Sequence, residues 1–75
     1  MTPKRFTVIL EHEAEGGFSV YVPGLPGCAS QGETEQEALT NIREAIEVYL
    51  LSLRDDGLPI PSEQTIRTTQ VEVAA

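Results

Sequence analysis

Apolar and polar residues alternate along two segments near the start of the chain. Residues 5–13 and 18–22 both follow period two and are rich in β-branched and aromatic side chains, which is typical of strands. Gly16 and Gly17 lie between them, and such a pair predicts a hairpin loop, because glycine accepts positive φ angles. One face of the hairpin is then expected to carry the apolar side chains Phe6, Val8, Leu10, Phe18, Val20 and Val22.

A proline-glycine turn separates the second strand from a short third one. Leu25–Cys28 fits a type II turn, in which Pro26 fixes φ at the second position and Gly27 takes positive φ at the third. The next residues, 28–31, are few but extended in character, and they predict a short edge-like strand.

A helical pattern begins at Thr34 and ends near Arg54. Thr34 and Glu37 have the spacing of a capping box. The apolar residues that follow lie within one stripe of a helix, roughly 140° wide. Gly57 and Pro59 then predict its end. The stripe consists of Ala38, Leu39, Ile42, Ala45, Ile46, Tyr49, Leu50 and Leu53.

The rest of the chain is a proline-rich connection over residues 55–67 and a final alternating segment. Residues 68–74 place Val71 and Val73 between polar neighbours, which predicts a last strand beside the first one. The predicted fold class is therefore α+β in the order βββαβ. It comprises an antiparallel three-stranded meander, one crossover helix and the last strand, in a single domain over residues 1–75.

Four apolar side chains remain outside the expected core. Ile9 and Tyr21 alternate onto the face of the sheet that one helix cannot cover, and Val48 and Leu51 lie off the apolar stripe. Scattered apolar side chains are normal on protein surfaces, and Leu51 could pack on the connection. Alternatively these residues form an oligomer or partner surface, which the small core of a 75-residue chain favours.

The net charge, the lack of long apolar runs and the few metal-binding side chains exclude several classes of protein. The formal net charge is −7, which disfavours direct nucleic-acid binding and suits a basic partner. No apolar run is long enough to span a membrane or to form a signal peptide, so we expect a cytoplasmic protein. One cysteine cannot form an internal disulfide, and one cysteine with one histidine makes a structural zinc site improbable.

Acidic residues cluster at the first hairpin, at Glu11, Glu13 and Glu15. Three interpretations fit these residues: a solvent-exposed acidic loop, a divalent-cation site, or a surface that binds a basic partner. A two-metal nuclease would need carboxylates that converge from several elements. The further candidates for that role are Glu44, Glu47 and Glu72, but the helical pair points away from the expected sheet.

The chain offers little else that could carry catalysis. His12 has no evident nucleophile or orienting group beside it in sequence. Cys28 follows a tight turn, where a small half-buried side chain is the simplest interpretation, and His12 is the one base it could use. We therefore expect no catalytic residue, no cofactor and no bound metal.

The stretch from Phe18 to Thr34 resembles the N-terminal domain of HicB antitoxins. The resemblance rests on the Leu25-Pro26-Gly27-Cys28 turn joined to the Gly32-Glu33-Thr34 helix start, and it continues at Glu37-Ala38-Leu39 and Ala45-Ile46. It covers residues 5–53 closely and implies a partial ribonuclease-H-like fold. Members of the family often form dimers or larger oligomers.

The resemblance also implies a function. Family members inhibit HicA-like toxins, which are small basic ribonucleases that cleave mRNA with a histidine, by covering the toxin's active site. The contact residues expected here are Glu11, Glu13, Glu15, Tyr21 and Glu33. The alternatives are a vestigial metal-dependent nuclease and an orphan oligomeric binding module.

Two features depart from the family pattern. Gly24 stands where members commonly have an acidic residue before Leu-Pro-Gly, which puts in doubt any role of that position. The residues after the helix are too few for the DNA-binding segment that many members carry, so operator binding by this chain alone is not expected.

Overall fold

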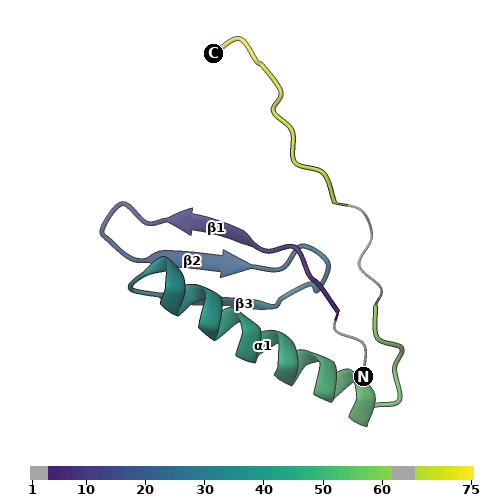
Figure 1. Ribbon diagram of the computed structural model, residues 1–75. Helices are drawn as coiled ribbons and strands as arrows, with labels where there is room; N and C mark the ends of the chain where they lie inside the picture. Colours follow the sequence, from purple (N-terminus) through teal and green to yellow (C-terminus); the bar gives the residue numbers. More distant parts are fainter. Residues whose placement is uncertain (1–3, 62–65) are drawn as a thin grey trace.

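The computed structural model describes residues 4–61 and 66–75. Three short antiparallel strands come first: β1 (Ile9–His12), β2 (Phe18–Tyr21) and β3 (Ala29–Gly32). One long helix, α1 (Glu35–Asp55), follows and packs on one face of the sheet (Figure 1). Within the described ranges, no helix combines the length and apolarity that crossing a bilayer requires.

The sheet is a meander in the order β1-β2-β3. Ile9 pairs with Tyr21, and Tyr21 in turn pairs with Ala29. Glycines at positive φ make both connections, as the sequence predicts. In the first hairpin these are Gly16 and Gly17, and in the second it is Gly27, where the amide of Cys28 donates to the carbonyl of Leu25 over 3.0 Å.

The helix is capped at both ends. The amide of Glu37 donates to Thr34 Oγ1 over 3.1 Å, as a capping box requires. The reciprocal bond differs from expectation, because Glu37 Oε1 accepts from the amide of Glu33, one residue earlier than the cap. At the other end Gly57 takes a φ of 69°, and the amide of Leu58 donates to the carbonyl of Leu53.

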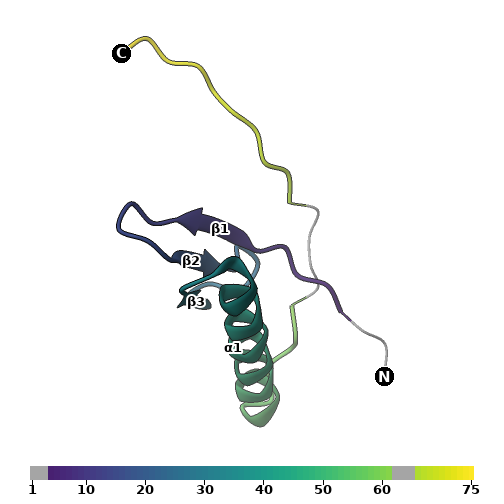
Figure 2. The same cartoon turned by 60° about the vertical axis from the view of Figure 1, so that its left-hand side comes forward.

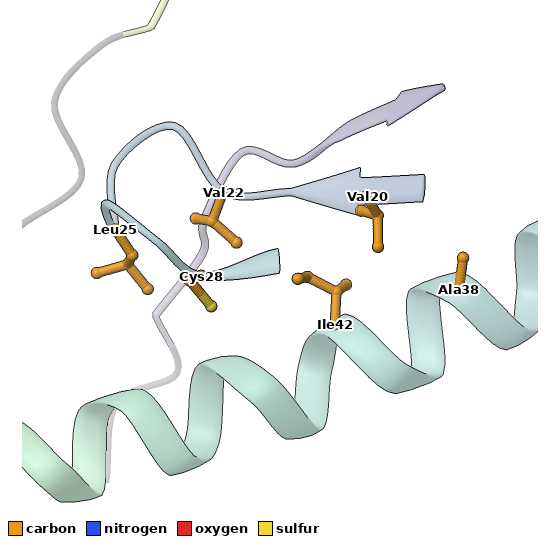
Figure 3. Packing of buried hydrophobic residues seen from close by; sticks show 6 residues of the cluster. All are labelled: Val20, Val22, Leu25, Cys28, Ala38 and Ile42. Atoms are coloured by element: carbon orange, nitrogen blue, oxygen red, sulfur yellow. The ribbon is translucent and has the colours of Figure 1, made fainter. Parts of the chain in front are cut away.

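The core lies between the helix and the inner face of the sheet. Its buried members are Val20, Val22, Leu25, Cys28, Ala38 and Ile42 (Figure 3). Phe6, Val8, Leu10 and Phe18 pack against this cluster from the same face. The expected inward face of the hairpin is therefore confirmed.

The helix sits mainly over β3 and then β2, with few contacts to β1 (Figure 2). Gly32 makes this placement possible: a Cβ there would lie 2.5 Å from the amide nitrogen of Ala38. Asn41 fixes the same contact, because its Nδ2 donates to the carbonyl of Gln31 over 2.7 Å. The small residues Gly32 and Ala38 thus let the two backbones approach closely.

The expected fifth element requires correction. Residues 66–75 run extended without forming a strand, and Val71 and Val73 are 81% and 75% exposed. Alternation shows that the segment suits a strand, but a strand also needs a hydrogen-bonding neighbour. Among residues 4–61 and 66–75, the sheet ends at β1 and β3. The first strand is also shorter than the expected 5–13, since its ladder with β2 covers Ile9–His12.

Replacing Gly32 with alanine is expected to lower the free energy of unfolding by about 1–3 kcal/mol, because the added methyl pushes the first helical turn off β3. Urea denaturation followed by circular dichroism measures the change. Gly24→Ala is the matched control, since a Cβ there meets nothing within 4 Å, and it should change stability by no more than about 0.5 kcal/mol. Equal stability of the two variants would contradict the proposed contact.

Candidate functional site

The face of the sheet opposite the helix is open. Side chains alternate along a strand, so every second row of cross-strand partners points away from the helix and forms this outer face. Its members are Ile9 and Glu11 from β1, Ser19 and Tyr21 from β2, and Ala29 and Gln31 from β3. None of these side chains is buried, and Tyr21 is 43% exposed.

The end of this outer face that lies away from the first hairpin is apolar. Ile9 and Tyr21 are direct cross-strand partners, and Ala29 lies on the far side of Tyr21. Directly opposed side chains on neighbouring strands lie near enough to contact. A half-exposed tyrosine with an aliphatic neighbour provides both apolar area and a hydroxyl group, a combination typical of protein interfaces.

Carboxylates follow this apolar end in the direction of the first hairpin. Glu11 pairs with Ser19 on the same face, and the hydroxyl of Ser19 donates to Glu13 Oε1. That hydrogen bond holds the Glu13 side chain against the end of the sheet, although Glu13 follows the strand. Glu15 lies beyond it in the hairpin loop and is exposed.

A shallow polar depression extends the acidic region toward the helix. It has a volume of about 320 Å³ and brings Glu13 and Glu33 to one place, with Gln31, Glu37 and Asn41 also at its wall. The sequence points to both glutamates but not to their place in one depression, because the register of the two strand pairs decides it. Gln31 was missed for the same reason.

The residues expected to form a surface therefore divide into separate groups. Glu11, Glu13 and Tyr21 share the outer face, and Glu33 adjoins them through the depression. Val48 and Leu51 are 66% and 54% exposed, but they lie on the helix and not on the outer face of the sheet.

The two reactive side chains lie in unreactive surroundings. His12 stacks on Phe18, its cross-strand partner, with ring centroids 4.6 Å apart and planes within 8°. Cys28 is buried in the core, and this burial raises the pKa of its thiol. A raised pKa lowers the thiolate fraction and therefore the nucleophilicity.

Carboxylates do not converge in the way that a metal-dependent nuclease needs. Among residues 4–61 and 66–75, no three His, Cys, Asp or Glu side chains gather closely enough to hold a metal ion. Glu44 and Glu47 lie exposed on the helix, and Glu72 lies in the extended segment after it.

Comparison with known proteins agrees with this geometry. Residues 6–74 match the sequence profile of a family described as the HicB-like antitoxin of bacterial toxin-antitoxin systems. A UPF0150 protein of Synechocystis is 48% identical over 69 residues, covering 88% of this chain and 87% of its own length. A UPF0150 protein of Thermoplasma acidophilum is 43% identical, covering 87% of this chain and 94% of its own length.

Cys28 should react slowly with thiol reagents while the chain is folded. At pH 8 we expect alkylation at least about tenfold slower than in urea, because the buried thiol must first be exposed. Mass spectrometry of timed samples measures the rate. Equal rates with and without denaturant would contradict the burial.

The same burial predicts a dependence of stability on pH. A thiol pKa that is higher in the folded than in the unfolded state leaves stability unaffected well below about pH 8.5, and lowers it as the pH rises above that value. Cys28→Ser should remove this decline from the urea midpoints.

Proposed function

Because the chain belongs to the HicB-like antitoxin family, we propose that it is the antitoxin of a toxin–antitoxin pair and that it inhibits a HicA-type toxin by covering the toxin's active site. The proposed contact surface is the outer face of the sheet with its acidic border. In this role the chain binds and does not catalyse, and it needs no cofactor.

The observation that carries the proposal is the acidic outer face. Its apolar end, with Ile9 and Tyr21, is accessible, and Glu11 and Glu13 follow toward the first hairpin. A ribonuclease that binds RNA must present positive charge around its active site. Carboxylates are complementary to such a surface, and the apolar end can exclude water once contact is made.

The chain's overall charge supports the same partner. A net charge of −7 on 75 residues creates a long-range field that attracts a basic protein and speeds association. The same charge repels RNA, so the antitoxin competes for the toxin without itself holding the toxin's substrate. Since the target of the toxin is mRNA, we place the pair in the cytoplasm.

The proposal assigns Ile9 and Tyr21 to the toxin rather than to self-association. The two residues adjoin the carboxylates that a basic partner would approach, whereas Val48 and Leu51 lie on the helix. Assembly of the antitoxin with itself then needs a different part of the molecule.

Co-expression with the basic product of the adjacent reading frame tests the proposal. We expect the antitoxin to restore growth of cells that produce the toxin, and a tagged antitoxin to co-purify with it. A catalytically inactive toxin, with its active-site histidine replaced, separates binding from toxicity. Failure both to restore growth and to co-purify would leave an orphan binding module as the better interpretation.

Charge reversal at the hairpin tests the surface. Glu11→Lys, Glu13→Lys and Glu15→Lys together should slow association with the inactive toxin by roughly 10- to 100-fold at low salt, because electrostatic steering is lost. The difference should shrink at high salt. Surface plasmon resonance at several salt concentrations measures both effects.

A variant with the same change in net charge provides the control. Glu47→Lys, Asp55→Lys and Asp56→Lys alter three exposed carboxylates on and just after the helix. This variant should retain an association rate within a fewfold of the parent, since its charges lie away from the outer face. Equal loss in both variants would show that net charge alone, and not this surface, guides the toxin.

A further inference from the structure

The outer edge of β3, on the side away from β2, has no strand beside it. The sheet has the order β1-β2-β3, so among residues 4–61 and 66–75 β3 pairs with β2 alone. A strand at the edge of a sheet presents backbone amides and carbonyls to which another chain can add. The strand Ala29–Gly32 contains no charged residue and no proline, although these are the side chains that commonly prevent such addition.

The bonds of the second hairpin show which backbone groups face this edge. The carbonyl of Cys28 accepts from the amide of Val22 over 3.0 Å, so it points toward the second strand. In an antiparallel pair, residues that bond to the partner strand alternate with residues whose backbone groups point outward. Two positions further on, Ser30 bonds to β2 in the same way. Ala29 and Gln31 therefore direct their amides and carbonyls to the open edge.

The side chain of Asn41 occupies one of these outward groups. Its Nδ2 donates to the carbonyl of Gln31 over 2.7 Å. An added strand would bring one of its own backbone amides to this carbonyl, because ladder bonds join the amides of one strand to the carbonyls of the next. The amide group of Asn41 therefore stands in the place that a fourth strand would take.

A groove beside the same edge would otherwise help a strand to add. It has a volume of about 650 Å³ and lies between β3 and the helix, with Ala29, Ala45 and Val48 among the residues that line it. Val48 is 66% exposed. An open strand edge next to exposed apolar side chains favours pairing with another chain. Asn41 also lines the groove, so one polar side chain separates the edge from this apolar surface.

We propose that Asn41 blocks the addition of a further strand to β3, so that copies of this chain do not join through this edge. The side chain binds the carbonyl that an added strand needs, and it fills the space beside it. The close contact of Gly32 with Ala38 makes this possible, because it brings the first turns of the helix to β3. The inference does not depend on the antitoxin function.

Hydrogen exchange of the unaltered chain gives the first test. The amides of Ala29 and Gln31 should show protection about tenfold or more lower than the amide of Ser30, because they face solvent while the Ser30 amide bonds to β2. Nuclear magnetic resonance in heavy water measures the three rates. Equal protection of all three amides would show that a strand covers the edge in spite of Asn41, and the proposal would be wrong.

Removal of the side-chain amide should open the edge. For Asn41→Ala we expect the mass measured by light scattering to rise with concentration to about twice that of the parent or more, since the smallest assembly joins two β3 edges. In the assembled form the amide of Gln31 should exchange about tenfold more slowly than in the parent. A variant that is folded by circular dichroism and keeps the parent's mass at every concentration would overturn the proposal.

Two further variants distinguish an open edge from a weakened fold. Ile42→Val removes a methylene group from the buried core and lowers stability, but it keeps Asn41 and should keep the mass of the parent. Adding Gln31→Pro to Asn41→Ala removes an outward amide, and proline is tolerated where a strand faces solvent. This double variant should therefore return to the parent's mass. Association of either variant would attribute the assembly to destabilisation and contradict the proposal.

Discussion

The close contact between β3 and the first turns of the helix determines how the rest of the molecule is arranged. Gly32 has no side chain and Ala38 has a small one, so the helix backbone reaches the sheet at its third strand. The bond from Asn41 to the carbonyl of Gln31 holds it there. One face of the sheet is therefore covered and the other is open. The helix also leaves the first strand with little cover, which creates the groove beside it.

The molecule holds both its cysteine and its histidine in packed contacts. Its cysteine is buried with a raised thiol pKa, and its histidine is stacked on a phenylalanine. The carboxylates of the described residues are spread over the surface and do not converge on a metal site. On the outer face Glu11 stands one row from Tyr21, and a carboxylate beside an accessible tyrosine suits recognition of a basic protein. This agrees with membership of an antitoxin family.

Local chemistry explains which parts of the fold could be predicted from the sequence. The turn at Leu25–Cys28 and the cap at Thr34 depend on residues that are neighbours in the chain, and both are confirmed. The segment 68–74 was misjudged because alternation describes a preference, whereas a strand also needs a partner. The candidate site was partly predictable. Alternation predicts Ile9 and Tyr21 on one face, but the depression that Glu13 and Glu33 both line depends on the register of two strand pairs.

The central claim is that the outer face of the sheet is the surface that holds the toxin. Nuclear magnetic resonance of the labelled antitoxin, titrated with an inactive toxin, tests it most directly. We expect the largest changes in amide chemical shift at the strand residues around Ile9, Tyr21 and Ala29 and in the first hairpin. Changes confined to the exposed side of the helix, with the strands unaffected, would contradict it.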